Sequence, residues 1–79
     1  MPRLPVVSSK EIIRALQKAG FEYAPKRGKG SHSAFVKKDY AGSRLVIVPE
    51  RKEMPRGTLL AILDQADLSK DEFILLLEG

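Results

Sequence analysis

The residues best suited to chemistry lie in the stretch RGKGSHSAF, residues 27–35, which holds the chain's only histidine, His32. Histidine as a residue type exchanges protons near neutral pH, and positioned proton transfer accelerates reactions by about 10²- to 10⁴-fold. RNA can be cut without a metal when one group removes the proton of its 2′-hydroxyl and another protonates the leaving oxygen. His32 suits either role, and the residue types leave open which one it takes.

Cations and glycines surround this histidine. Three cations precede it within six residues, two more follow it, and no acid occurs between residues 26 and 38. Glycines allow the backbone to approach a phosphate closely and leave its amide donors unobstructed. The stretch therefore predicts an anion site with one titrating group. The residues expected to bind RNA are Lys26, Arg27, Gly28, Lys29, Gly30, Ser31, Lys37 and Arg44.

A purely structural interpretation of the same stretch stays open. In it Ser31 and His32 begin a strand, the glycines form a turn and the lysines are a solvated edge that discourages aggregation. A zinc site is disfavoured because one histidine and no cysteine leave the ligands to carboxylates, so we expect no metal and no cofactor. Serine catalysis is also disfavoured, since the direct neighbours of His32 on a strand point to the opposite face.

Length and composition limit the possible architectures. A chain of 79 residues buries only about 60% of its unfolded surface, so we expect one domain spanning residues 1–79. The absence of cysteine excludes disulfides and suits a reducing cytoplasm. No apolar run is long enough for a membrane span or a signal peptide, so we expect a cytoplasmic protein without a membrane partner.

Charge is distributed unevenly along the chain. Residues 1–63 hold 13 lysines and arginines against 5 acids, a balance of +8, whereas residues 64–79 carry −4. A positive field on so small a body favours a polyanion such as nucleic acid, although a merely solvated surface has the same signature.

Helix signals stand at both ends of the chain. Ser8 and Glu11 have capping-box spacing, apolar residues then recur every three or four positions, and Gly20 supplies a stop. A second helix is expected from Pro55 to Ala66. Pro55 suits its first turn, and an apolar stripe follows that ends at Ala66. Ser69 opens a short third helix with the same capping-box spacing.

Three strands are expected between the first two helices. A short strand begins at Phe21 and ends at Pro25, and residues 32–38 and 44–48 form a hairpin. The buried face of the first hairpin strand is ambiguous. Tyr23 and Phe35 are expected to complete the core, and Tyr40, in the turn, is the best candidate for stacking on a base.

These elements predict an α+β fold in the order α-β-β-β-α, with a short helix added at the C-terminus. The strand connections are too short for parallel crossovers, so the sheet should be antiparallel. Both long helices should cover its one apolar face in a two-layer sandwich, leaving the other face for solvent or a ligand.

Several motifs, in this order and spacing, resemble those of the HicA toxins of bacterial and archaeal toxin–antitoxin modules. The resemblance extends from the first helix to Ser69. Its motifs are Lys18-Ala19-Gly20-Phe21, Gly30-Ser31-His32 with Phe35, Val46-Ile47-Val48-Pro49, Pro55-Arg56-Gly57-Thr58-Leu59, Ile62-Leu63 and Gln65-Ala66.

The resemblance implies a fold like that of double-stranded-RNA-binding domains, and mRNA cleavage that inhibits translation. It implies that His32 is catalytic and that a cognate HicB antitoxin covers this histidine and its basic surroundings. The chain departs from the family pattern twice. Glu50-Arg51 stands where relatives often have a second histidine, and Asp67 stands where they have a glycine.

The sequence thus favours a metal-independent endoribonuclease toxin, with two alternatives. An RNA-binding module without catalysis would need only the fold and the positive field. A protein–protein adaptor would be indifferent to RNA and expose an apolar patch, and the acidic C-terminal helix is one surface that could serve for docking.

Overall fold

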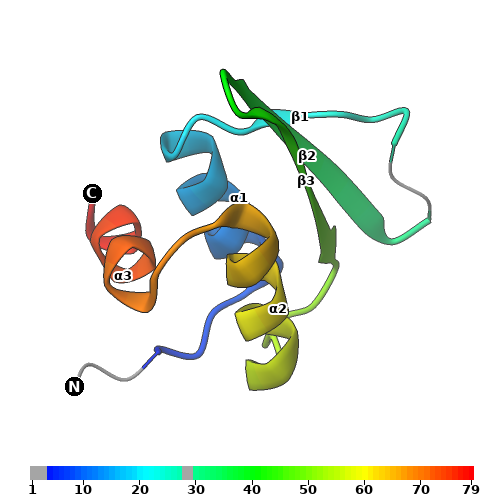
Figure 1. Cartoon of the computed structure of the whole chain (residues 1–79). Helices are drawn as coiled ribbons and strands as arrows, with labels where there is room; N and C mark the ends of the chain where they lie inside the picture. The colour runs from blue at the N-terminus through cyan, green and yellow to red at the C-terminus, as the bar shows by residue number, and fades with distance from the viewer. Residues whose placement is uncertain (1–3, 28–29) are drawn as a thin grey trace.

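The computed structural model describes residues 4–27 and 30–79. The three strands form one antiparallel sheet with β2 in the middle, and the helices all lie on one side of it (Figure 1). This confirms the expected two-layer α+β fold with its additional third helix. The elements are α1 (Ser9–Lys18), β1 (Glu22–Tyr23), β2 (His32–Asp39), β3 (Gly42–Pro49), α2 (Arg56–Ala66) and α3 (Lys70–Glu78).

Both ends of α1 follow from the residues that flank it. The Ser8 side chain accepts a hydrogen bond from the Glu11 amide at 3.3 Å, and the Glu11 carboxylate accepts one from the Ser8 amide at 3.0 Å. After the helix, Gly20 has a φ of +100°, a conformation that side chains disfavour. The Phe21 amide then donates to the Leu16 carbonyl at 2.9 Å, which closes a Schellman motif and turns the chain toward β1.

The hairpin of β2 and β3 shows which face of the sheet the helices cover. Phe35 pairs with Val46, and both side chains are buried in the core with residues of the helices. Because side chains alternate along a strand, the neighbours of Phe35 point away from the helices. We call this other side the open face; it carries His32, Ala34, Val36 and Lys38 of β2 and Ser43, Leu45, Ile47 and Pro49 of β3.

Tyr23 departs from the expectation that it completes the core. Its ring centroid lies 5.6 Å from that of Phe35, yet its side chain remains 58% exposed. The reason is that β1 has only two residues and lies at the edge of the sheet, so nothing beyond it covers the outer side of the ring. Phe35, in contrast, is buried as expected.

The start of α2 differs slightly from the expectation. Pro55 is the N-cap residue with extended geometry, so the helix begins one residue later, at Arg56. The Leu59 amide still donates to the Pro55 carbonyl at 2.9 Å. The shift of one residue does not change which side chains are buried, and Leu59, Ile62, Leu63 and Ala66 form the covered stripe.

The third helix is part of the same core. Its capping box is complete, with the Glu72 amide donating to Ser69 Oγ at 3.1 Å and the Ser69 amide donating to Glu72 Oε1 at 2.9 Å. Phe73 is fully buried among residues of the core. The Lys18 ammonium of α1 also donates to the Leu76 carbonyl at 3.1 Å, which ties the two helices together.

Candidate nucleic-acid interface

His32 is the first residue of β2 and is exposed on the open face. It pairs with Pro49, the last residue of β3, so it stands at the end of the hairpin opposite its turn. The Glu50 amide donates to the Ser31 carbonyl at 2.9 Å and holds the strands together just beyond this pair. The imidazole is therefore presented to solvent from a hydrogen-bonded sheet.

The basic loop joins β1 to His32. Lys26 and Arg27 lie in a turn that is closed by the Arg27 amide donating to the Ala24 carbonyl at 3.0 Å, and both side chains are exposed. Gly30 has a φ of +59°, so a glycine suits this step into the strand. Ser31 is exposed beside His32. Of the predicted RNA-binding residues, Gly28 and Lys29 lie outside the described part of the chain.

Lys37 and Arg44 are not brought together with His32. They pair with each other near the hairpin turn, five residues along β2 from His32 and so about 16 Å away along the strand. Both are on the side of the sheet that the helices cover. Arg44 forms an ion pair with Asp67 at 3.3 Å, and the Lys37 ammonium lies 5.9 Å from the centre of the Phe21 ring.

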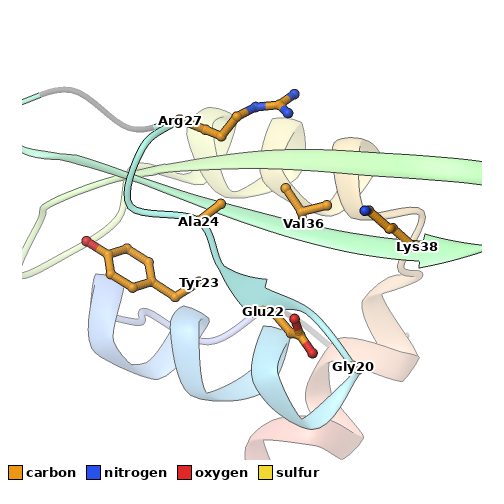
Figure 2. A pocket seen from close by; sticks show the side chains of 7 residues that line it. All are labelled: Gly20, Glu22, Tyr23, Ala24, Arg27, Val36 and Lys38. Carbon is orange, nitrogen blue, oxygen red and sulfur yellow. The ribbon is translucent and has the colours of Figure 1, made fainter.

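The neighbour of Lys37, Lys38, lies on the open face instead. It lines a hollow of about 460 Å³ together with Arg27, Glu22 and Val36, next to the edge strand β1. In Figure 2 the side chains of Arg27, Val36 and Lys38 gather on one side of β1, and Tyr23 is directed away from them. Alternate residues of a strand point to the same face, and Lys38 is an even number of residues from His32. The sequence could therefore have identified Lys38 as the lysine that shares a face with His32.

A second basic hollow lies at the His32 end of the sheet. It has a volume of about 580 Å³, and three cations line it. The Arg51 carbonyl accepts a hydrogen bond from the Ser9 amide at 3.0 Å, which fixes the segment after β3 against the start of α1. Because Glu50 also bonds to Ser31, this hollow is next to the start of β2. Its lining residues are Ser8, Ser9, Lys10, Glu50, Arg51 and Lys52.

Two kinds of feature are absent from residues 4–27 and 30–79. No three or more histidine, cysteine, aspartate or glutamate side chains in this part come together in a way that could hold a metal ion. Within the same residues, every helix is too short or too polar to cross a membrane.

A comparison with models of protein families matches residues 9–68 to the HicA toxin of bacterial toxin–antitoxin systems. The match covers most of the chain, from the start of α1 to the residue after the α2 cap. The chain belongs to the HicA toxin family. A search of curated proteins found no match. Membership in this family implies a cognate antitoxin as the partner, and α3 lies beyond the matched residues.

One departure from the HicA pattern is explained by the geometry around Asp67. This residue follows α2 with φ 56° and ψ 41°, the left-handed conformation that favours glycine. The Leu68 amide donates to the Leu63 carbonyl at 2.9 Å, as in the motif that ends α1. Aspartate tolerates this conformation better than most residues, and here its carboxylate also pairs with Arg44.

The Gln65-Ala66 motif also has a structural basis in this HicA chain. The Gln65 side chain accepts a hydrogen bond from the Ile47 amide at 3.1 Å, so α2 satisfies a donor on the outer edge of β3. Ala66 is buried in the core. The motif therefore joins α2 to the sheet and blocks one donor through which another strand could pair with this edge.

Proposed function

We propose that this HicA chain is an endoribonuclease that cuts mRNA without a metal ion, with His32 transferring a proton. The observation that carries the proposal is the position of His32. It stands exposed at the start of the central strand, directly after the basic loop and at the same end of the sheet as a hollow lined by three cations.

In the proposed reaction the 2′-hydroxyl of RNA attacks the adjacent phosphorus, and the bond from phosphorus to the 5′-oxygen breaks. The products are a 2′,3′-cyclic phosphate and a 5′-hydroxyl, so no water is consumed in this step. His32 either takes the proton of the 2′-hydroxyl or gives one to the 5′-oxygen. With no second histidine in the chain, water, a lysine or the substrate serves in the other role.

Charge stabilisation falls to the cations around His32. Lys26 and Arg27 of the loop, with Lys29, would hold the phosphate while negative charge builds on its oxygens. Gly28, Gly30 and Ser31 would let the backbone approach it. We assign Lys37 and Arg44 a lesser part than the sequence suggested, because both are engaged on the covered side.

The second basic hollow would hold an RNA phosphate farther along the strand. Lys10, Arg51 and Lys52 line it at the same end of the sheet as His32. Each such contact releases counterions, so affinity should fall steeply with salt. We also propose that a HicB-like antitoxin silences the toxin by covering His32 and the loop, and that the toxin acts in the cytoplasm, where mRNA is translated.

The test is incubation of purified protein with end-labelled RNA in excess EDTA, followed by analysis of the product ends. Cleavage with cyclic phosphate ends would support a metal-independent 2′-hydroxyl mechanism. Cleavage that EDTA abolishes, or products with 5′-phosphates, would overturn it.

An RNA-binding module without catalysis is the second candidate. The hollow lined by Lys10, Arg51 and Lys52 favours it, because it offers phosphate contacts without requiring any proton transfer. This candidate predicts no products at any protein concentration in the cleavage experiment, and a retarded RNA band when the same mixtures are run on a native gel.

A further inference from the structure

The hollow beside β1 has a lining that phosphate binding does not explain. Its volume of about 460 Å³ is within the range of small-ligand sites. Arg27 and Lys38 supply positive charge, and Val36 and Ala24 supply half-buried apolar surface. Among the described residues that line it, Glu22 is the one acid, and a carboxylate repels phosphate oxygens.

Glu22 is placed on the open face by its strand. It pairs with Val36, and paired residues in an antiparallel sheet point to the same side. Among the described residues the one ion pair within 4 Å is that of Arg44 and Asp67. Glu22 therefore lines the hollow together with two cations without being neutralised by direct contact with either, and its oxygens are exposed to accept hydrogen bonds.

We propose that this hollow reads one base of single-stranded RNA and that Glu22 determines its preference for guanine. The Watson–Crick edge of guanine presents two adjacent N–H donors, at N1 and N2, which match the two oxygens of a carboxylate. Its O6 acceptor then faces Lys38, which leaves Arg27 for the phosphate held by the loop. Uracil presents a single N–H between two carbonyl oxygens, which the carboxylate would repel.

The apolar part of the hollow would contribute to binding by contacting the flat face of the base. A flipped-out base in single-stranded RNA needs a surface to lie against, and Val36 with Ala24, which line the hollow among the charged groups, offers one. The combination of one carboxylate, two cations and an apolar floor suits a nucleobase better than it suits a phosphate, which has no N–H donors and no apolar surface.

The base bound in this hollow would lie at a fixed distance along the RNA from the bond that is cut. Val36 is four residues from His32 on the same face of β2, about 13 Å along the strand. The base read by Glu22 is therefore a neighbour of the scissile bond and does not lie at it. This inference rests on the proposed cleavage activity, because the offset has meaning only if His32 marks the cut.

The experiment maps the cut sites of a long transcript for wild type and for Glu22→Gln, compared at equal extents of cleavage. The control is Glu53→Gln, an exposed glutamate that does not line this hollow. We expect guanine to be enriched at one fixed position for wild type and Glu53→Gln, and Glu22→Gln to lower that enrichment about tenfold, as for the loss of a bidentate base contact. An unchanged site distribution in Glu22→Gln would overturn the inference.

A binding measurement separates this inference from the proposed activity. Short oligonucleotides that differ only in guanine or uracil at one position are titrated against His32→Ala, alone and combined with Glu22→Gln. A preference for guanine that disappears with Glu22→Gln supports the subsite even if wild type cuts no RNA, which would be failure of the proposed function alone. Equal affinity for both bases would overturn the subsite.

Discussion

Two adjacent lysines on β2 have opposite surroundings. Lys37 points to the covered side, where its ammonium lies 5.9 Å from the centre of the Phe21 ring, and its strand partner Arg44 pairs with Asp67 at 3.3 Å. Lys38 points to the open face and lines a hollow with Arg27. The difference shows that the alternation of side chains along the strand, and not proximity in sequence, decides which cations share a face with His32.

The uneven charge of the chain has a spatial explanation. Acids of the C-terminal part interact with cations of the covered side: Asp67 forms an ion pair with Arg44, and the charge of Lys37 contributes to lowering the pKa of Glu72. Part of the net charge of −4 on residues 64–79 is thus neutralised by cations within the fold. The cations of the loop and the open face are on the other side, where they can face a polyanion.

The largest expected effect tests whether the covered side carries the stability. Phe35→Ala removes a fully buried ring from the core and should lower the free energy of unfolding by about 3–5 kcal/mol. Leu45→Ala, on the open face and 39% exposed, should cost about 1 kcal/mol or less. Urea denaturation measures both, and equal losses would contradict the assignment of the two faces.

The next largest effect concerns RNA binding and distinguishes Lys38 from Lys37. Lys38→Gln should lower the salt slope of RNA binding by at most about 0.7, because it removes one cation from the face on which the RNA lies, and this is up to roughly threefold in affinity between 50 and 200 mM salt. Lys37→Gln, which changes the neighbouring charge, is the matched control and should leave the slope unchanged. The reverse outcome would restore Lys37 as the RNA contact that the sequence predicted.

The smallest effect concerns acid stability on the covered side. The backbone N–H of Ser69 donates to Glu72 and holds the pKa of that carboxyl below its usual value, with a smaller contribution from Lys37. A carboxyl whose pKa is lowered by folding stabilises the fold above its unfolded pKa, and this stability is lost as the pH falls through the folded pKa.

Wild type should therefore lose more stability than Glu72→Gln between pH 6 and pH 3. Unfolding curves at each pH measure the difference. Parallel losses in the two proteins would show that this hydrogen-bonded carboxylate does not contribute.

Most of the fold could be predicted because its signals are local. The two capping boxes, the glycine that ends α1 and the β-branched run of β3 each specify an element within a few residues. Tyr23 could not be placed in the same way. Its exposure depends on how short β1 is and on its position at the sheet edge, which are properties of the assembled sheet.

The candidate site was predicted less completely. His32 and the loop are contiguous in sequence, so their proximity needs no tertiary information. The ion pair of Arg44 with Asp67 joins a strand to the end of a helix, and the two basic hollows combine residues from separate elements. The ion pair follows from the packing of α2 against the sheet, the hollow at the His32 end from the position of α1, and the hollow beside β1 from the pairing of β1 with β2, none of which sequence spacing specifies.

The most direct test of the central claim compares two properties of His32→Ala on one RNA. The cleavage rate should fall at least 100-fold, the lower range for loss of a proton-transfer group, and the affinity for the RNA should stay within about twofold because the cations remain. If the variant cuts RNA at the wild-type rate, His32 does not transfer the proton and the proposed mechanism is wrong.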